Sequence, residues 1–180
     1  MKTDLRIKLT QKMIKDSFLE LLKEKPYNRI TVKEICDKAE INRGTFYKHY
    51  YDTLDLMEQL ENEAIENFEK MVQQDITADS KSILLAILHF VQNNHELFTT
   101  LYSNGDKNRF LSRLSERCTK HLFSLFSSAS SEETMKNKFS FYYIAGGTTN
   151  IIEQYLSGKL DMSPELLAEQ LEALNAKIFF

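Results

Sequence analysis

Apolar residues recur at three- and four-residue spacing along most of this chain, and no segment sustains an alternation of apolar and polar residues. This spacing is typical of amphipathic α-helices, whereas alternation would indicate strands. Two prolines and five glycines in 180 residues leave few positions that interrupt a helix. The pattern therefore predicts an all-α protein. Its expected helices are one that ends before Pro26, one that begins at Thr31, Arg43–Tyr50, one from Asp52 or Thr53 to about Gln74, and then about 80–93, 94–103, 107–127, 132–157 and 164–178.

Residues 27–52 carry local signals for two short helices joined by a tight turn. Thr31 is followed three residues later by Glu34, which is the spacing of a capping box, so one helix is expected to begin there. Asn42 is a suitable cap for the next helix. Two helices this close together in sequence predict a helix-turn-helix.

The second of these helices has an apolar face and a polar face. Phe46 and Tyr50 lie four residues apart on the side that packs inward, while Arg43, Tyr47 and Lys48 fall on another. Guanidinium and ammonium groups on such a helix can donate to guanine O6 and N7 in the major groove of DNA. The pattern therefore favours a DNA-binding site. Its predicted DNA-binding residues are Thr31, Arg43, Gly44, Thr45, Tyr47, Lys48, His49 and Thr53.

Charge is divided unevenly along the chain. The net charge is −3, but residues 1–50 carry 12 Lys and Arg against 7 Asp and Glu, and residues 51–180 carry 11 against 19. A basic first part, at +5, has the electrostatics of a nucleic-acid-binding surface. The alternative is that these charged helices simply face solvent. Because the excess coincides with the helix-turn-helix pattern, the DNA interpretation is favoured.

The segments YNRITV at 27–32 and AEINRGTFYKHY at 39–50 resemble the amino-terminal domain of the TetR/AcrR family of transcriptional regulators. The resemblance extends over roughly residues 6–60 and covers about a dozen matched positions, which makes it more specific than a short motif. It implies a three-helix helix-turn-helix DNA-binding domain over residues 1–52. It also implies a helical-bundle effector-binding and dimerisation domain over residues 53–180.

The same resemblance implies a function. The protein is expected to be a ligand-responsive regulator, most simply a repressor, that binds a palindromic double-stranded DNA operator as a homodimer. A small-molecule effector would release it from DNA by favouring another dimer geometry. The segment 141–171 also resembles a TetR subgroup with a reduced body, some of whose members are regulators linked to dihydroxyacetone kinase, and this adds only to the expected architecture.

Two positions depart from the family pattern. Family members usually have glycine after the alanine of the turn, where the backbone tends to adopt positive φ, but this chain has Glu40. Keeping the left-handed conformation there is expected to cost on the order of 1–2 kcal/mol. The family also often has lysines after the aromatic that ends the recognition helix, where this chain reads YDTLD at 51–55. Hydroxyl groups and helix amides are then expected to contact phosphate instead.

Aromatic residues are concentrated in the second part of the chain. The simplest interpretation is a helical core. The family resemblance adds the alternative of an effector cavity, because ligand sites are mostly apolar with a few placed polar groups. The predicted ligand-binding residues are His89, Phe90, Phe98, Tyr102, Phe110, Tyr142 and Tyr143.

The carboxy-terminal segments are expected to form the dimer. Ala145, Gly146 and Gly147 place small residues in an apolar segment, which allows a close helix approach at an interface or a ligand wall, at about 1 kcal/mol of helix propensity per glycine. In the family the last two helices form a four-helix dimer interface. The corresponding residues here are Ile144, Gly147, Ile151, Ile152, Tyr155, Leu167, Leu171, Leu174 and Ile178.

Several classes of protein are not favoured. Cys36 and Cys118 are far apart and lack the spacing of a metal site or a disulfide framework. No phosphate-binding glycine loop, nucleophile elbow or HExxH motif is present, so no enzyme, metal site or cofactor is predicted. No apolar run is long enough for a signal peptide or a membrane span, so a cytoplasmic protein is expected.

Two alternatives to the regulator remain. One is a helical interaction module whose amino-terminal domain no longer binds DNA, which Glu40 and the missing lysines near Asp52 make conceivable. Binding to duplex that is absent or insensitive to salt would favour it. The other is a helical protein that binds or converts a small molecule, which turnover without a DNA partner would favour.

Overall fold

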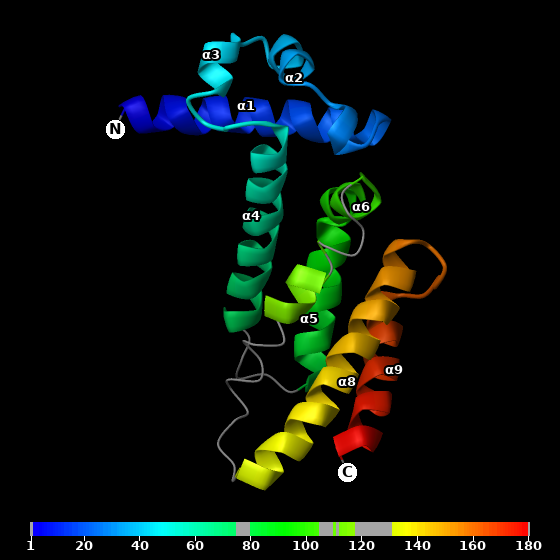
Figure 1. The fold of residues 1–180 in the computed structure, drawn as a ribbon. Coiled ribbons are helices and arrows are strands. Elements are labelled where there is room, and N and C mark those ends of the chain that lie inside the picture. The colour runs from blue at the N-terminus through cyan, green and yellow to red at the C-terminus, as the bar shows by residue number, and fades with distance from the viewer. Residues whose placement is uncertain (1, 75–79, 105–109, 111, 118–130, 180) are drawn as a thin grey trace. The chain divides into compact units, whose positions relative to one another are not determined.

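The computed structural model describes residues 2–74, 80–104, 110, 112–117 and 131–179. Every regular element in these residues is helical, which confirms the predicted all-α fold (Figure 1). The α-helices are α1 Lys2–Glu24, α2 Val32–Lys38, α3 Arg43–Phe46, α4 Thr53–Gln74, α5 Ser80–Asn93, α6 His95–Asn104, α8 Ser131–Leu156 and α9 Pro164–Phe179, with a short 3-10 turn at Tyr27–Arg29. Residues 110 and 112–117 are also helical, and the rest of the helix expected at 107–127 lies outside the described residues.

The chain divides into two compact units. The first consists of Met1–Ala64 with Thr100–Lys107, and the second of Ile65–Thr99 with Asn108–Phe180. α4 is continuous, beginning in the first unit and ending in the second.

The first unit is built around the helix-turn-helix. α2 packs against both α1 and α3, and the contact buries the apolar faces that the sequence spacing predicts. Burial of this apolar surface is the main stabilising contribution. The fully buried side chains include Ile14, Phe18, Leu22, Ile35, Phe46 and Leu56.

The second unit is a helical bundle in which α9 packs against both α5 and α8. Figure 1 shows α8 and α9 as an antiparallel pair joined by a short connection. That connection contains Gly158 at φ 72°, a left-handed conformation that favours glycine. The core cluster comprises Leu84, Leu88, Leu167, Ala168 and Leu171.

Phenylalanine rings form a second packed series in this unit. Their centroids lie 5.6 Å apart for Phe68 and Phe90, 6.0 Å for Phe90 and Phe98, and 5.7 Å for Phe98 and Phe110. The first two pairs are edge-to-face, the arrangement that the ring quadrupoles favour. Arg117 adds a bidentate contact to Glu69 on α4, with nitrogen–oxygen distances of 2.8 and 2.7 Å.

The recognition helix is shorter than the segment Arg43–Tyr50 expected from sequence, since the α-helix itself ends at Phe46. Beyond it the amide of Lys48 donates to the Thr45 carbonyl at 3.3 Å, and the amide of His49 to the Phe46 carbonyl at 2.9 Å. These three-residue bonds tighten the final turn. The tighter path ends at Tyr50, whose side chain is 2% exposed.

Glu40 keeps the left-handed conformation that glycine usually provides in this family, with φ 54°. It follows Ala39, the C-cap residue of α2, and the amide of Ile41 donates to the Cys36 carbonyl at 3.0 Å. This bond closes the turn in the Schellman pattern. The turn therefore keeps its usual hydrogen bond although a non-glycine residue occupies the left-handed position. The left-handed conformation of Glu40 carries the expected conformational cost.

Replacing Glu40 by glycine is expected to stabilise the first unit by about 1 kcal/mol, because relief of the left-handed strain outweighs the added entropy of the unfolded chain. Urea unfolding followed by circular dichroism measures the change. Glu66→Gly, at an exposed position within α4, is the matched control and should instead destabilise by roughly 0.5–1 kcal/mol. A destabilised Glu40→Gly variant would contradict the assigned strain.

Candidate DNA-binding site and effector cavity

α2 begins with a complete capping box. The Thr31 amide and hydroxyl both donate to Glu34 Oε2 at 2.9 Å, and the Glu34 amide donates to Thr31 Oγ1 at 3.3 Å. Lys25 pairs with the same carboxylate. The Lys25 ammonium, followed by the Thr31 amide and hydroxyl, lowers the pKa of Glu34 from 4.5 to about 2. The cap thus fixes the start of the first helix of the helix-turn-helix.

This cap predicts a pH dependence. Because the folded pKa of Glu34 is depressed, its stabilising contribution is present above about 4.5 and is lost as the pH falls towards about 2. The melting temperature of the Glu34→Gln variant should therefore lie below that of the unmodified protein at pH 7. The difference should shrink steadily between pH 4.5 and the acid limit of the measurement. A difference independent of pH in this window would show that the carboxylate charge is not responsible.

α3 is also fixed at its start by a side chain. Asn42 Oδ1 accepts from the Thr45 amide at 2.8 Å and from the Thr45 hydroxyl at 3.0 Å. Below the helix the Phe46 ring is fully buried, with the Tyr50 ring centroid 5.6 Å away. One face of this turn is therefore held in the core, and the opposite face is directed to solvent.

Arg43 and Lys48 are both exposed. Among the described residues, neither forms an ion pair or a side-chain hydrogen bond. Other cations of the same unit behave differently, since Lys15 pairs with Glu63 and Lys38 with Glu20. The segment 43–50 is called the recognition turn below. Its two cations are thus available to an anionic partner.

The remaining predicted DNA-binding residues differ in their exposure and in their hydrogen bonds. Tyr47 is 58% exposed, with its ring edge-to-face on Phe46. Gly44 is exposed, and an added Cβ would lie only 3.3 Å from Asn42 Oδ1, so its lack of a side chain suits the capped turn. His49 is half-buried. Thr45 uses its hydroxyl in the Asn42 cap.

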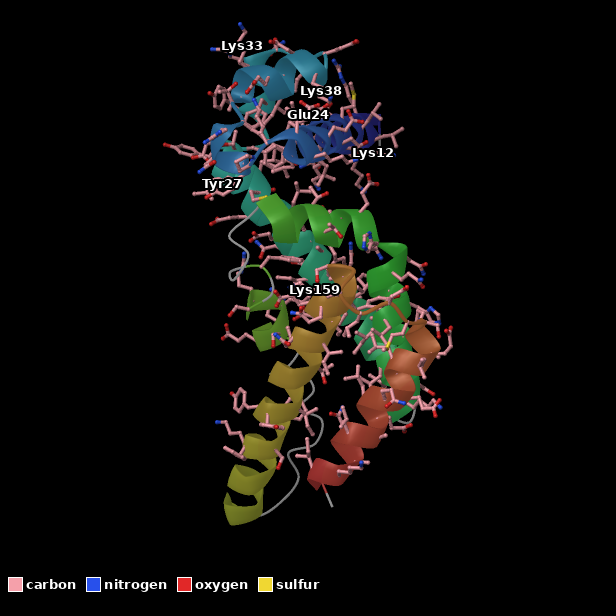
Figure 2. The ribbon with its side chains drawn as sticks, turned by 90° about the vertical axis from the view of Figure 1, so that its right-hand side faces the viewer. Lys12, Glu24, Tyr27, Lys33, Lys38 and Lys159 are labelled. Carbon is pink, nitrogen blue, oxygen red and sulfur yellow. The ribbon has the colours of Figure 1, made fainter. Side chains whose placement is uncertain are left out.

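Thr31 and Thr53 stand at the starts of α2 and α4. Thr31 is exposed, with its hydroxyl engaged by Glu34, and Thr53 is half-buried. Asp52 caps α4 by accepting from the Asp55 amide at 2.8 Å. The acidic segment that replaces the usual family lysines therefore has a structural role as a cap. Lys33 of α2 is also exposed (Figure 2), and it was not among the DNA-binding residues predicted from the sequence.

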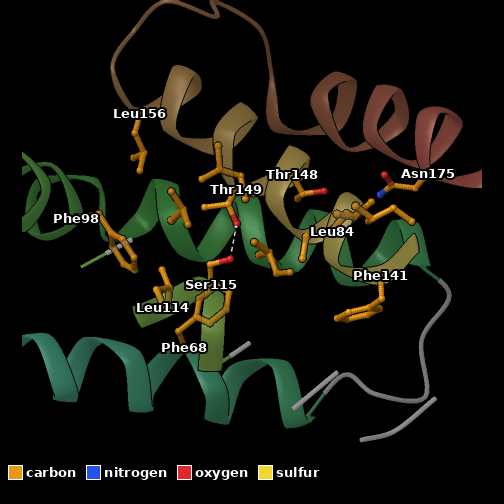
Figure 3. A pocket seen from close by; sticks show the side chains of 15 residues that line it. Phe68, Leu84, Phe98, Leu114, Ser115, Phe141, Thr148, Thr149, Leu156 and Asn175 are labelled. Carbon is orange, nitrogen blue, oxygen red and sulfur yellow. Dashed lines mark hydrogen bonds between the residues drawn. The ribbon is translucent and has the colours of Figure 1, made fainter. Parts of the chain in front are cut away.

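The second unit contains a cavity of about 150 Å³ (Figure 3). α8 supplies nearly half of its lining, and α4, α5, α6, residues 114–115 and α9 supply the rest. Of the six predicted ligand-binding residues whose side chains the structure describes, only Phe98 lines it. Sequence reasoning missed the polar members Ser115, Thr148, Thr149 and Asn175. The one sequence feature that could have indicated them is the presence of small polar residues within otherwise apolar helical segments.

The other predicted ligand-binding residues lie elsewhere. Phe90 and Phe110 belong to the packed phenylalanine series. His89 is half-exposed, with its Nε2 atom 3.6 Å from Glu165 Oε1. Tyr102 is within α6, but its side chain lies outside the described part of the structure. Tyr142 and Tyr143 are 56% and 65% exposed on α8.

These two tyrosines line a groove of about 690 Å³ on the outer side of α8 and α9. Predicted dimer residues in the groove are Ile144, Gly147, Ile151, Leu171, Leu174 and Ile178. Three others pack inside the unit: Leu167 belongs to the core cluster, and Ile152 and Tyr155 pack against it. Leu174 and Ile178 are 51% and 37% exposed, so the groove retains an uncovered apolar rim.

Gly146 and Gly147 are the most informative part of this groove. An added Cβ at either position would meet no described atom within 4 Å. Two glycines in the middle of a helix cost about 1 kcal/mol each, and packing against the described residues does not account for that cost.

The fold and its exposed recognition turn define a helix-turn-helix DNA-binding protein with a separate helical bundle. Residues 16–60 match the family model for bacterial regulatory proteins of the tetR family. Residues 78–177 match the model for a transcriptional regulator C-terminal region. The chain belongs to the TetR family of transcriptional regulators, whose members are non-enzymatic DNA-binding proteins. Its amino-terminal domain is a DNA-binding domain.

Individual relatives agree with this assignment. An uncharacterised HTH-type transcriptional regulator, YxbF of Bacillus subtilis, is 28% identical over 104 residues, which cover 54% of this chain and 27% of that protein. The chain thus spans about a quarter of the length of that relative.

Solved structures share the fold over nearly the whole chain. A TetR regulator from Streptococcus agalactiae has a TM-score of 0.72 at 21% identity, covering 97% of this chain and 98% of the other. One from Aquifex aeolicus has a TM-score of 0.71 at 19% identity, covering 95% and 99%. The dihydroxyacetone kinase operon activator DhaS has a TM-score of 0.64 at 24% identity, covering 94% and 96%.

Within the described residues, no helix is both long and apolar enough to cross a membrane. The same part of the chain contains no group of three or more His, Cys, Asp or Glu residues that could hold a metal ion.

Proposed function

We propose that this TetR-family regulator is a homodimeric repressor that binds a partly palindromic operator and is released by a small-molecule effector. Residues 1–52 act as the DNA-binding domain and residues 53–180 as the effector-binding and dimerisation domain. Two recognition turns enter successive major grooves about 34 Å apart. The dimer works in the cytoplasm, where the DNA of a bacterial regulator is found.

The proposal of DNA binding rests on the contrast between exposed cations and a buried aromatic ring in the segment 43–50. Arg43 and Lys48 are exposed and form no ion pair with a described residue, while Phe46 beneath them is fully buried. A rigid turn with unpaired cations on its outer face is suited to base edges and phosphates. Gly44, Thr45, Tyr47 and His49 complete the contact face, with Thr31 and Thr53 near phosphate at helix starts.

The groove of α8 and α9 supports the homodimer. Its exposed rim includes Tyr142, Tyr143 and Leu174, and its floor includes the two glycines with open space beside them. A second copy of the same face would cover this apolar surface and use the close approach that glycine allows. We therefore assign Tyr142 and Tyr143 to the dimer interface in this proposal, rather than to the effector.

Replacing Gly147 by methionine is expected to disrupt the dimer and leave the protomer folded. An added Cβ at this position meets no described atom of its own chain within 4 Å, and methionine favours helix over glycine by roughly 0.7 kcal/mol. Sedimentation velocity measures the dimer, and circular dichroism measures the fold. Gly147→Ala is the graded control, with a smaller loss of association. A fully dimeric Gly147→Met protein would remove this face from the interface.

The function as a whole is tested by selecting genomic DNA. The purified protein is incubated at moderate salt, with competitor, with fragments of DNA from its source organism, and the retained fragments are sequenced. A recovered palindrome upstream of a gene supports the proposal, and a reporter driven by that site then distinguishes repression from activation. If nothing is retained above background, with or without candidate effectors, the operator-binding proposal fails.

A further inference from the structure

The cavity of the second unit has a distinctive chemical composition. None of the fifteen described residues that line it is Asp, Glu, Lys, Arg or His. Four carry a polar side chain, and these are Ser115, Thr148, Thr149 and Asn175. The other eleven are Phe68, Leu84, Ile87, Val91, Phe98, Leu114, Phe141, Ile144, Ala145, Ile152 and Leu156.

This lining discriminates against charge. An ion that enters an apolar cavity loses its hydration, at an effective cost of several kcal/mol, unless a counter-ion or several hydrogen bonds replace it. No side chain among the described residues of the lining supplies a counter-ion. Carboxylates and ammonium compounds are therefore poor ligands, whereas neutral apolar compounds gain from burial.

The polar residues of the lining differ in whether their side chains have a hydrogen-bond partner. Thr149 donates to Ser115 across the cavity, with 3.2 Å between their Oγ atoms, as the dashed line in Figure 3 marks. Thr148 Oγ1 is buried and has no hydrogen-bond partner among the described residues. A hydroxyl in a helix commonly bonds to the carbonyl four residues before it, so this unpaired state is unusual. Leaving such a group unsatisfied costs about 1–3 kcal/mol.

The volume of the cavity indicates the size of the ligand. An apolar protein cavity of about 150 Å³ is known to hold one benzene molecule, and the cavity here has this volume. A single six-membered ring matches this volume.

We infer that the effector is an uncharged, ring-sized apolar compound with one hydroxyl or carbonyl group, and that this group bonds to Thr148. The inference rests on the proposed function, since it names the chemical class of the effector. Thr148 is the specificity-determining residue of the cavity, and the apolar lining supplies the burial.

Three probes test the inference with the full-length protein and without DNA. Phenol and toluene have nearly the same shape and differ by a hydroxyl in place of a methyl group, and benzoate adds a negative charge to the same ring. Their dissociation constants are measured by NMR titration. Phenol and toluene should both bind, and benzoate should not bind at the same concentrations.

The matched variant is Thr148→Val, which keeps the shape of the side chain and removes its hydroxyl. The affinity of phenol relative to toluene should fall about fivefold to tenfold, as expected for loss of one hydrogen bond. Toluene should bind the variant at least as well as the unmodified protein. Thr10→Val, on α1 outside the cavity lining, is the control and should leave the ratio unchanged.

Three outcomes would overturn the inference: no probe binds, benzoate binds as tightly as phenol, or Thr148→Val leaves the phenol-to-toluene ratio unchanged. Because the titrations contain no DNA, they are independent of the proposed repressor function. Retention of operator DNA in the presence of phenol is measured separately. If the probes do not bind but the operator DNA does, only the proposed effector class is rejected. If the probes bind as expected but no operator DNA is retained, only the operator proposal is rejected.

Discussion

Replacement of Arg43 by alanine is expected to weaken operator binding by about tenfold to a hundredfold, since a bidentate contact to a base edge is worth about 1–3 kcal/mol. Its guanidinium is exposed on α3 and has no ion-pair partner among the described residues, so no ion pair is lost with it. The fold should therefore remain intact. Preference at one base pair of the operator should be relaxed as well, because a base contact carries sequence information.

Lys48→Ala should also weaken binding, by a comparable or smaller factor. If its ammonium contacts a phosphate, the slope of log affinity against log salt concentration should fall by about 0.9. Fluorescence anisotropy with the selected operator at several salt concentrations measures both variants. Lys159→Ala, at an exposed lysine of the second unit, is the matched control. Unchanged affinity and unchanged sequence preference in both the Arg43→Ala and the Lys48→Ala variant would contradict the assigned contact face.

The largest expected effect on stability is that of Phe46→Ala. This ring is fully buried below the recognition turn and contacts both Tyr47 and Tyr50. Removing a buried phenylalanine typically costs about 3–5 kcal/mol, which is a large part of the stability of a small domain. The first unit should unfold at much lower urea concentration, and operator binding should be lost at 37 °C.

A conservative change at Tyr50 controls for this experiment. The Tyr50 hydroxyl is buried without a hydrogen-bond partner among the described residues, and burial, followed by Glu63 and Asp55, raises its pKa to about 12. Tyr50→Phe keeps the ring and removes the unsatisfied group, so stability should be unchanged or slightly higher. If Phe46→Ala and Tyr50→Phe had equal effects, the packing of the Phe46 ring would not be what supports the turn.

Local chemistry explains why the amino-terminal part was predictable. The Thr31–Glu34 capping box and the Asn42 cap involve residues three positions apart, and each forms in the structure as the spacing predicts. The left-handed turn at Glu40 was expected from the glycine that the family usually has there, and its φ of 54° shows that this conformation is kept. The end of the recognition helix was not predictable in this way. It depends on how Tyr50 returns to the core, which is a tertiary contact.

The cavity shows the opposite case. Residues on six segments of the second unit line it, and helical periodicity indicates which face of each segment is apolar but not where those faces leave a space. Sequence reasoning therefore selected large aromatic residues, of which Phe90 and Phe110 are packed in the core and Tyr142 and Tyr143 are exposed. Thr148 could not be recognised, because its missing hydrogen bond depends on neighbours from other helices.

By itself the sequence determined the all-α class, the family and the helix-turn-helix, because caps, helical spacing and the matched string at 39–50 depend on residues near each other in the chain. Only the tertiary structure decided three properties of the described residues: which cations are left unpaired, that the glycines of α8 have no atom within 4 Å of an added Cβ, and which buried hydroxyl of the cavity lining has no partner. Each of these properties is set by side chains distant in sequence, since burial and hydrogen bonding depend on everything that packs around a group.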